Sequence, residues 1–188
     1  IMDTASQRFG AVDAVVNVAA LDTLFGGITD SPVEDWQASF DTNVLGTVNL
    51  VRAATPHLEA AGGGAIVMIG SQSAMLPQVM QITYAAAKGA LQSSMLYMAK
   101  ELGPRKIRVN TVIPTWMWVP PVQGYVSMTA QDQGVAEDQI IAGITANMPL
   151  GEIPADEDVA ECVVFLCSDR ARMITGQSIL VNAGELMR

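Results

Sequence analysis

Four short apolar runs rich in valine and isoleucine recur along the chain, separated by longer segments with helical periodicity. The runs lie at 13–19, 65–70, 108–113 and 178–182. Each run is continuously apolar instead of alternating, which is typical of parallel strands that are buried on both faces. The pattern therefore predicts four buried strands.

The segment between the first two runs has the features of a long helix over 32–60. Ser31 stands directly before Pro32, a residue that suits the first helical position. Glu34 follows three residues after the serine, as a capping box requires. We expect Ser31 to be the N-cap of this helix.

Two further helices are expected at 82–102 and after Pro154, where acidic residues occupy the first turn. Strand–helix–strand alternation indicates the α/β class, with a doubly wound, Rossmann-like parallel sheet, and we expect 1–188 to form a single domain. The span 114–154 is rich in Met, Trp, Gln and Pro, and this pattern predicts an irregular loop. A loop of that length is expected to be a substrate-binding lid.

Composition narrows the classes of function. The 188 residues are 50% hydrophobic and 15% charged, which fits a globular domain and not a disordered chain. The net charge of −9 argues against binding to nucleic acid or to an anionic membrane. No apolar run approaches the roughly 18 residues that cross a bilayer, and the first ten residues are too polar for a signal peptide. We expect a cytoplasmic protein whose partner is a small molecule, with no nucleic acid and no membrane.

Metal chemistry is not expected. His57 is the only histidine, which argues against a histidine-based triad and against a site with several histidine ligands. Cys162 and Cys167 lie five residues apart among apolar neighbours, so we expect reduced core residues.

A serine, a tyrosine and a lysine form the strongest candidate for chemistry. Ser71 directly follows the second apolar run, at the end of a parallel strand where ligands bind. Tyr84 and Lys88 lie one turn apart on the helix expected at 82–102. Because an ammonium favours a nearby phenolate, we expect Lys88 to lower the pKa of Tyr84 from about 10 toward neutrality. Tyr84 would then exchange a proton with an alcohol or carbonyl oxygen.

The same spacing of tyrosine and lysine also occurs by chance on amphipathic helices. The serine thirteen residues before the tyrosine, at a strand end, favours the catalytic interpretation.

Six segments, in order along the chain, resemble the short-chain dehydrogenase/reductase family. They are RFGAVDAVVNVAA, FDTNVLGTVNL, GGGAIVMIGSQSA, YAAAKGAL, IRVNTVIPT and ITGQSILVNAG. The resemblance implies an NAD(P)-dependent oxidoreductase that transfers a hydride between a nicotinamide and an alcohol/ketone pair, with NAD or NADP as cofactor.

The resemblance also implies a role for each member of a catalytic set. Tyr84 would be the acid/base, and Lys88 would bind the nicotinamide ribose and lower the pKa of Tyr84. Ser71 would position the substrate oxygen, and Asn43 would hold a water that links Lys88 to solvent. Ser73 is an alternative to Ser71, but its spacing to Tyr84 does not fit the family.

The residues that the resemblance assigns to cofactor binding, besides Tyr84 and Lys88, are Asn17, Ala19, Ala20, Pro114, Thr115 and Met117. Two turns depart from the family pattern. Its Asn-Asn-Ala-Gly turn is here Asn17-Val18-Ala19-Ala20, in which the small alanines keep close approach of the cofactor feasible. Its Pro-Gly turn is here Pro114-Thr115. The backbone of Met117 could still make the contacts to the nicotinamide carboxamide.

The glycine-rich turn with which the family begins, Thr-Gly-x-x-x-Gly-x-Gly, does not occur among these residues. We therefore expect the chain to correspond to the carboxyl-terminal two-thirds to three-quarters of a family domain. The strand at 13–19 would then lie at an open edge of the sheet.

Large apolar side chains in the expected lid favour a bulky apolar ketone or alcohol over a sugar, although they could equally pack the lid onto the body. We expect Trp116 and Trp118, with Ser71 and Tyr84, to contact the substrate.

The helices at 32–60 and 82–102 are apolar on more than one face, and with the resemblance this predicts a homo-oligomer, most simply a tetramer.

The alternative hypothesis is a non-catalytic binding or scaffold protein derived from this fold. The absent glycine-rich turn favours that alternative, whereas the four placed residues of the catalytic set argue against it.

Overall fold

The computed structural model describes residues 1–187, in which four parallel strands form one sheet. The strands are β1 (Ala14–Asn17), β2 (Gly64–Ile69), β3 (Ile107–Pro114) and β4 (Ser178–Val181), and they lie in that order across the sheet. All four predicted strands are confirmed, and each boundary falls within two residues of its apolar run.

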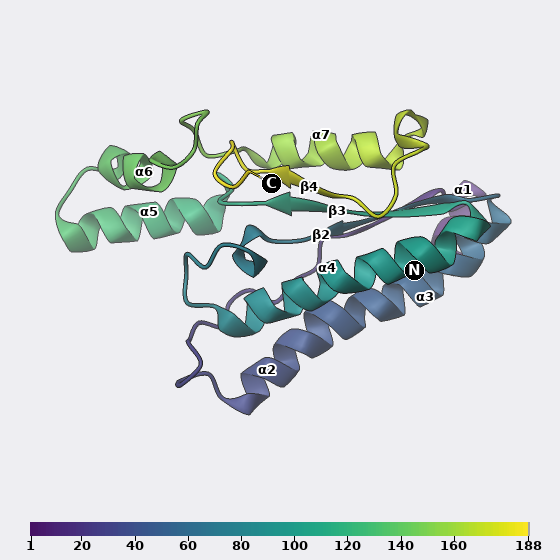
Figure 1. The fold of residues 1–188 in the computed structure, drawn as a ribbon, viewed down its shortest axis with the longest axis horizontal. Helices are drawn as coiled ribbons and strands as arrows, with labels where there is room; N and C mark the ends of the chain where they lie inside the picture. The colour runs from purple at the N-terminus through teal and green to yellow at the C-terminus, as the bar shows by residue number, and fades with distance from the viewer. Residues whose placement is uncertain (188) are drawn as a thin grey trace.

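Helices cover both faces of the sheet. They are α1 (Met2–Phe9), α2 (Val33–Phe40), α3 (Gly46–Ala60), α4 (Ile82–Leu102), α5 (Pro120–Gln133), α6 (Glu137–Thr145) and α7 (Asp156–Cys167). Figure 1 shows α3 and α4 along one face, α7 along the other, and α5 and α6 beyond the carboxyl ends of the strands. Across residues 1–187, no helix is both long enough and apolar enough to cross a membrane.

The core lies in two layers, one on each face of the sheet. Successive residues of a strand point to opposite faces. Ile66 and Met68 of β2 belong to the cluster beneath α3 and α4, whereas Val67 belongs to the cluster beneath α7. Because both faces are covered, β2 needs an apolar side chain at nearly every position, and this explains its continuous pattern.

Strand β1 lies at an edge of the sheet. Its only strand neighbour in the described part of the chain is β2, with Val15 opposite Ile66. The side chains of Val16 and Val18 are 39% and 66% exposed. The expected open edge of the sheet is therefore present at β1.

The start of the first long helix differs from the prediction. The helix begins at Val33, after an extended Pro32 with ψ 158°, and no side chain caps it. A Cβ atom on Gly26 would lie only 2.6 Å from Oγ of Ser31, so that hydroxyl packs against the preceding loop instead of the helix. The capping box of Ser31 and Glu34 is wrong.

The same segment is also interrupted in its middle. Residues Asp41–Leu45 form a π-helical turn between α2 and α3. Such a turn contains one extra residue and is frequent at functional sites. The predicted single helix over 32–60 is thus two helices joined by this turn.

The span 114–154 is not an irregular loop, because α5 and α6 occupy most of it. Pro120 and Pro121 stand in the first turn of α5, where the missing N–H groups cost nothing. The helical pattern was hidden because α5 buries only Val126 and Ala130 and α6 buries no residue. A weak apolar stripe gives little periodic signal.

The two cysteines of α7 are free thiols, as expected. Cys162 and Cys167 are half-buried and pack against the core cluster beneath this helix. Burial raises the pKa of both thiols, which keeps them protonated and unreactive.

Candidate functional site

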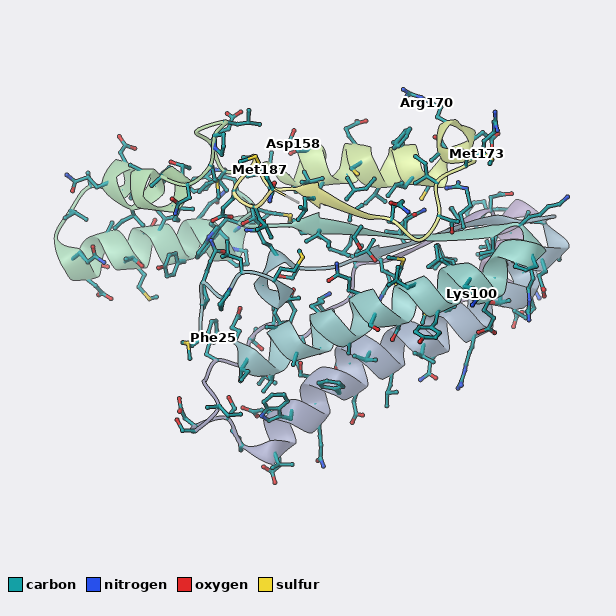
Figure 2. The ribbon with its side chains drawn as sticks, viewed as in Figure 1. Phe25, Lys100, Asp158, Arg170, Met173 and Met187 are labelled. Atoms are coloured by element: carbon teal, nitrogen blue, oxygen red, sulfur yellow. The ribbon has the colours of Figure 1, made fainter. Side chains whose placement is uncertain are left out.

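The structure brings Ser71, Tyr84 and Lys88 together at the carboxyl end of β2. They line one cavity of about 330 Å³, and the Ser71 hydroxyl lies close enough to Tyr84 to lower the pKa of the phenol. Figure 2 shows Phe25 and Met187 at this end of the molecule, with Arg170 and Met173 at the opposite end. The three residues that the sequence spacing singled out therefore lie at one site.

A glycine allows the serine to reach this position. Gly70 directly follows β2 and lies close to β3. A Cβ atom at Gly70 would lie only 2.8 Å from Cγ2 of Thr111. Beyond Gly70, the backbone of Ser71 is extended, and its Oγ accepts a hydrogen bond from the backbone N–H of Ser73 at 3.2 Å. The two serine hydroxyls are 2.8 Å apart. Ser73 thus fixes the orientation of Ser71 and lines the same cavity.

Lys88 is buried beside the tyrosine. Lys88 is only 3% exposed, and its Nζ donates a hydrogen bond to the backbone carbonyl of Ile69 at 2.7 Å. Nζ lies 5.5 Å from the centroid of the Tyr84 ring. Burial lowers the pKa of Lys88 to about 8, and the nearby carboxylate of Asp22 partly opposes that change.

The pKa of Tyr84 does not follow the prediction. Burial raises it above its ordinary value, the hydrogen bond from Ser71 lowers it, and the negative charge of Asp22 raises it. The expected lowering by Lys88 is wrong for this structure, because the ammonium is directed to the carbonyl of Ile69 and desolvation dominates. At neutral pH, Tyr84 therefore holds its proton and can donate it.

Asn43 occupies the π-helical turn and is 1% exposed. Its Nδ2 donates to the carbonyls of Leu21 and Ser39, each at 3.0 Å, and its Oδ1 accepts from the N–H of Leu21 at 3.0 Å. The side chain does not line the tyrosine cavity and is occupied by protein partners. In this structure the Asn43 side chain positions the loop after β1.

The predicted cofactor residues divide into two groups. Those that line the cavity with Tyr84 and Lys88 are Ala20, Pro114, Thr115 and Met117. Asn17 and Ala19 do not line it, and Nδ2 of Asn17 donates to Oγ1 of Thr47 at 2.6 Å.

The donor set of the cavity fits a nicotinamide ribose. An ammonium has three N–H groups, and the carbonyl of Ile69 takes one of those of Lys88. The phenol of Tyr84 and the remaining N–H groups of Lys88 are suitable partners for ribose hydroxyls. Ala20 and Gly70 also line the cavity and leave room for a flat ring to approach the backbone.

A polar network that the sequence did not reveal joins the ends of β2, β3 and β4. Gln72 is buried, and its Nε2 donates to Oε2 of Glu185 at 2.7 Å and to Oγ1 of Thr115 at 3.2 Å. Its Oε1 accepts from Nδ2 of Asn182 at 2.6 Å. Thr115 and Gln78 also donate to the carboxylate of Glu185. Only the sheet topology brings together residues so far apart in the sequence.

Asp22 is a second residue that the sequence did not single out. It lines the cavity with Tyr84 and Lys88, and its backbone carbonyl accepts a hydrogen bond from the side chain of Gln81. The loop that carries it is also held by Asn43, through Leu21. A carboxylate thus has a fixed place at this cavity.

The expected substrate contacts are met in part. Trp116 lines the tyrosine cavity, whereas Trp118 does not and is 37% exposed. The Trp116 ring lies 5.4 Å from that of Tyr125, with the planes inclined by 32°. These two rings also line a second hollow of about 400 Å³ between α5 and α6, which we call the α5–α6 groove.

A proton donor, a second hydroxyl and a buried ammonium lie together where the parallel strands end, an arrangement that can exchange a proton with an alcohol or carbonyl oxygen. Comparison with known proteins agrees. The family model described as "Enoyl-(Acyl carrier protein) reductase" matches residues 1–185. The chain belongs to the short-chain dehydrogenase/reductase family, a class of NAD(P)-dependent oxidoreductases that act on alcohol and carbonyl groups.

Individual relatives cover nearly the whole chain. An uncharacterized oxidoreductase of Methylorubrum extorquens is 35% identical over 98% of this chain and 70% of its own length. The L-rhamnose 1-dehydrogenase (NAD(P)(+)) of Azotobacter vinelandii is 34% identical over 98% of this chain and 68% of its own. The structure of L-sorbose reductase from Gluconobacter frateurii, in complex with NADPH and L-sorbose, matches with a TM-score of 0.92 at 28% identity. That match covers 100% of this chain and 71% of the reductase.

Proposed function

We propose that the protein transfers a hydride between the nicotinamide of NAD or NADP and an alcohol/ketone pair, with Tyr84 as the acid/base. The observation that carries this proposal is the cavity that Ser71, Tyr84 and Lys88 line together. The family membership supports the same chemistry.

Each residue has a defined part in reduction. When bound, the nicotinamide supplies the hydride that the carbonyl carbon receives. Tyr84, protonated at neutral pH because burial raises its pKa, donates its proton to the carbonyl oxygen, and the product is the alcohol. Ser71 hydrogen-bonds that oxygen. The N–H groups of Lys88 that the carbonyl of Ile69 does not take would hold the ribose. Oxidation of an alcohol runs through the same steps in reverse.

The substrate that we propose is a bulky apolar ketone or alcohol. Trp116 and Met117 line the cavity and support this choice. Other apolar side chains of 114–154 lie elsewhere, because Met128 is 59% exposed and Met148 is buried away from the cavity. The wall formed by α5 and α6 would act as the cover of the site.

A homo-oligomer, in its simplest form a tetramer, is part of the proposal. Exposed apolar side chains on α4 support it, since Leu96 is 54% and Tyr97 is 75% exposed. Large exposed apolar residues that gather on one helix are typical of interfaces between copies.

The experiment that tests the function measures binding and turnover together. Titration with NADH and NADPH, followed by the fluorescence of the reduced nicotinamide, should show saturable binding, and a panel of secondary alcohols and ketones should include substrates. Lys88→Ala should weaken both binding and turnover. Binding without turnover of any member of the panel would instead favour the scaffold protein.

A further inference from the structure

The polar network at the ends of β2, β3 and β4 has one carboxylate at its centre, that of Glu185. Its Oε2 accepts from Gln72 at 2.7 Å, and Thr115 and Gln78 donate to the same carboxylate. Glu185 lines the α5–α6 groove but not the cavity that contains Tyr84, whereas its three donors all line that cavity. The carboxylate can therefore act on the reaction only through these donors.

Gln72 connects this carboxylate to the serine of the site. It follows Ser71 directly, begins the 3₁₀ turn Gln72–Ala74 and is only 1% exposed. The N–H of Ser73, in the same turn, donates to Oγ of Ser71 at 3.2 Å. The position of the Ser71 hydroxyl therefore depends on where this turn lies, and the hydrogen bonds of the Gln72 side chain hold the turn in place.

The hydrogen bonds of the network all run in one direction. The backbone N–H of Gly184 donates to Oδ1 of Asn182 at 3.1 Å, so Nδ2 of Asn182 points at Oε1 of Gln72, 2.6 Å away. Gln72 must then present its NH₂ group to Glu185, because an ionised carboxylate can only accept. Reversal of either amide would place two donors or two acceptors face to face. The network thus fixes a single orientation of Gln72.

The backbone that carries Glu185 is held in an unfavourable conformation. Ala183 is buried and has φ 51°, in the left-handed region that residues other than glycine rarely adopt. Gly184 follows with φ 84°, and a Cβ atom there would lie 3.0 Å from the Pro149 ring. Such strain persists only where the surrounding contacts enforce it, and it is frequent at functional sites. The strained turn after β4 is what brings Glu185 to the ends of β2 and β3.

We propose that Glu185 is a positioning residue for the reaction at Tyr84, because through Gln72 it holds Ser71 in the orientation that contacts the substrate oxygen. The proposal rests on the function proposed at Tyr84. Thr115 donates to the same carboxylate, so Glu185 also fixes the turn after β3 relative to the serine. Misplacement of a catalytic group by about 1 Å can lower a rate about a hundredfold.

The test is a double-mutant cycle between positions 72 and 185. Gln72→Glu keeps the side-chain volume but sets a second carboxylate against the first, so the hydrogen bond between the two positions is lost. Glu185→Gln, added to it, restores that bond in the reverse direction and returns the net charge to that of wild type. Gln131→Glu is the control for the added charge, because Gln131 is an exposed residue of α5 that lines neither hollow.

We expect Gln72→Glu to lower kcat about tenfold or more for each ketone that wild type reduces, with the Kd for the reduced nicotinamide cofactor unchanged. The double variant should recover kcat to within about threefold of wild type, and Gln131→Glu should behave as wild type. The factor lost in Gln72→Glu should be the same at every pH, because a displaced serine slows the reaction without changing the ionisation of Tyr84. Circular dichroism of the same samples gives the folded fraction, and kcat is expressed per folded protein.

A second variant, Gln72→Met, covers the case in which two facing carboxylates prevent folding. It keeps the length of the side chain, removes every hydrogen bond of the amide and adds no charge. It should lower kcat as Gln72→Glu does. Adding Glu185→Gln should not restore kcat in this background, because position 72 no longer offers a hydrogen-bond partner.

Three results would overturn the proposal. They are a wild-type kcat per folded protein in both variants of Gln72, a double variant no faster than Gln72→Glu, or a pH profile that shifts in Gln72→Glu, since the loss would then come from charge near Tyr84. In all three, loss of turnover in Tyr84→Phe would leave the function itself standing. If wild type reacted with no alcohol or ketone of any kind, this proposal and the function proposed at Tyr84 would fall together.

Discussion

The two walls of the site differ in how they are built. The inner wall carries Ser71, Tyr84 and Lys88 on the end of β2 and on α4, and α4 buries Ala87, Leu91 and other residues in the core. The outer wall consists of α5 and α6. Helix α5 buries two residues and α6 buries none.

This contrast relates to what each wall does. Proton transfer needs atoms held to within a fraction of an ångström, and side chains on core-anchored elements provide that precision. Binding of the remote part of a substrate tolerates more variation. Elements with few buried apolar contacts also open at lower free-energy cost, so the outer wall is the part suited to admit and release substrate.

The largest effect expected of a single change is on the inner wall. Tyr84→Phe removes the proton donor and should lower turnover by about 10²- to 10⁴-fold, with nicotinamide affinity nearly unchanged. Steady-state kinetics and a fluorescence titration measure the two quantities. Tyr97→Phe, on the exposed side of the same helix, is the control and should behave as wild type. If Tyr84→Phe kept a tenth of the turnover, the assignment of the acid/base would be wrong.

A comparison of stability separates the two walls directly. Met95 of α4 is fully buried, so Met95→Ala should lower the free energy of unfolding by about 2–5 kcal/mol. Ile140 of α6 is only half-buried, and Ile140→Ala should cost less than about 1 kcal/mol. Denaturant unfolding gives both values. Equal costs would remove the distinction between the walls.

The buried lysine should make stability depend on pH. The pKa of Lys88 is about 8 in the folded protein and 10.5 for a lysine in water, so between these pH values the unfolded chain binds a proton that the folded chain does not. Raising the pH through this window therefore stabilises the fold, on the order of 2–3 kcal/mol. Unfolding of wild type and Lys88→Met at pH 8 and pH 10.5 isolates the contribution. A parallel pH dependence in both proteins would show that Lys88 is not buried as described.

The polar network beneath the site should give a smaller effect. Glu185→Gln replaces an acceptor of three hydrogen bonds with an amide, whose NH₂ group cannot accept from Gln72, Thr115 or Gln78. We expect a loss of about 1–2 kcal/mol in the free energy of unfolding. Glu152→Gln, at an exposed position, should have no effect. An equal change in the two variants would mean that the network contributes nothing.

The sequence predicted the inner wall well because its signals are local. Continuous apolar runs identified the strands, and the spacing of Tyr84 and Lys88 on one helix placed them on one face. Ser71 could be placed because a residue that follows a buried parallel strand lies at the ligand-binding edge.

The features that escaped prediction depend on tertiary structure. Gln72 and Glu185 meet only because the sheet topology brings the ends of β2 and β4 together. The pKa of Tyr84 rises because of burial, which no spacing in the sequence reports. The helices of the outer wall bury too few residues to leave a periodic pattern.

The most direct test of the central claim labels the hydride and removes the proposed proton donor in the same experiment. Wild type and Tyr84→Phe are each mixed in a single turnover with reduced nicotinamide deuterated at the transferable position and a ketone substrate, and the product is analysed by mass spectrometry. The account predicts one deuterium on the alcohol carbon of the wild-type product and no product from Tyr84→Phe in the same time. An alcohol without deuterium, or equal product from Tyr84→Phe, would contradict it.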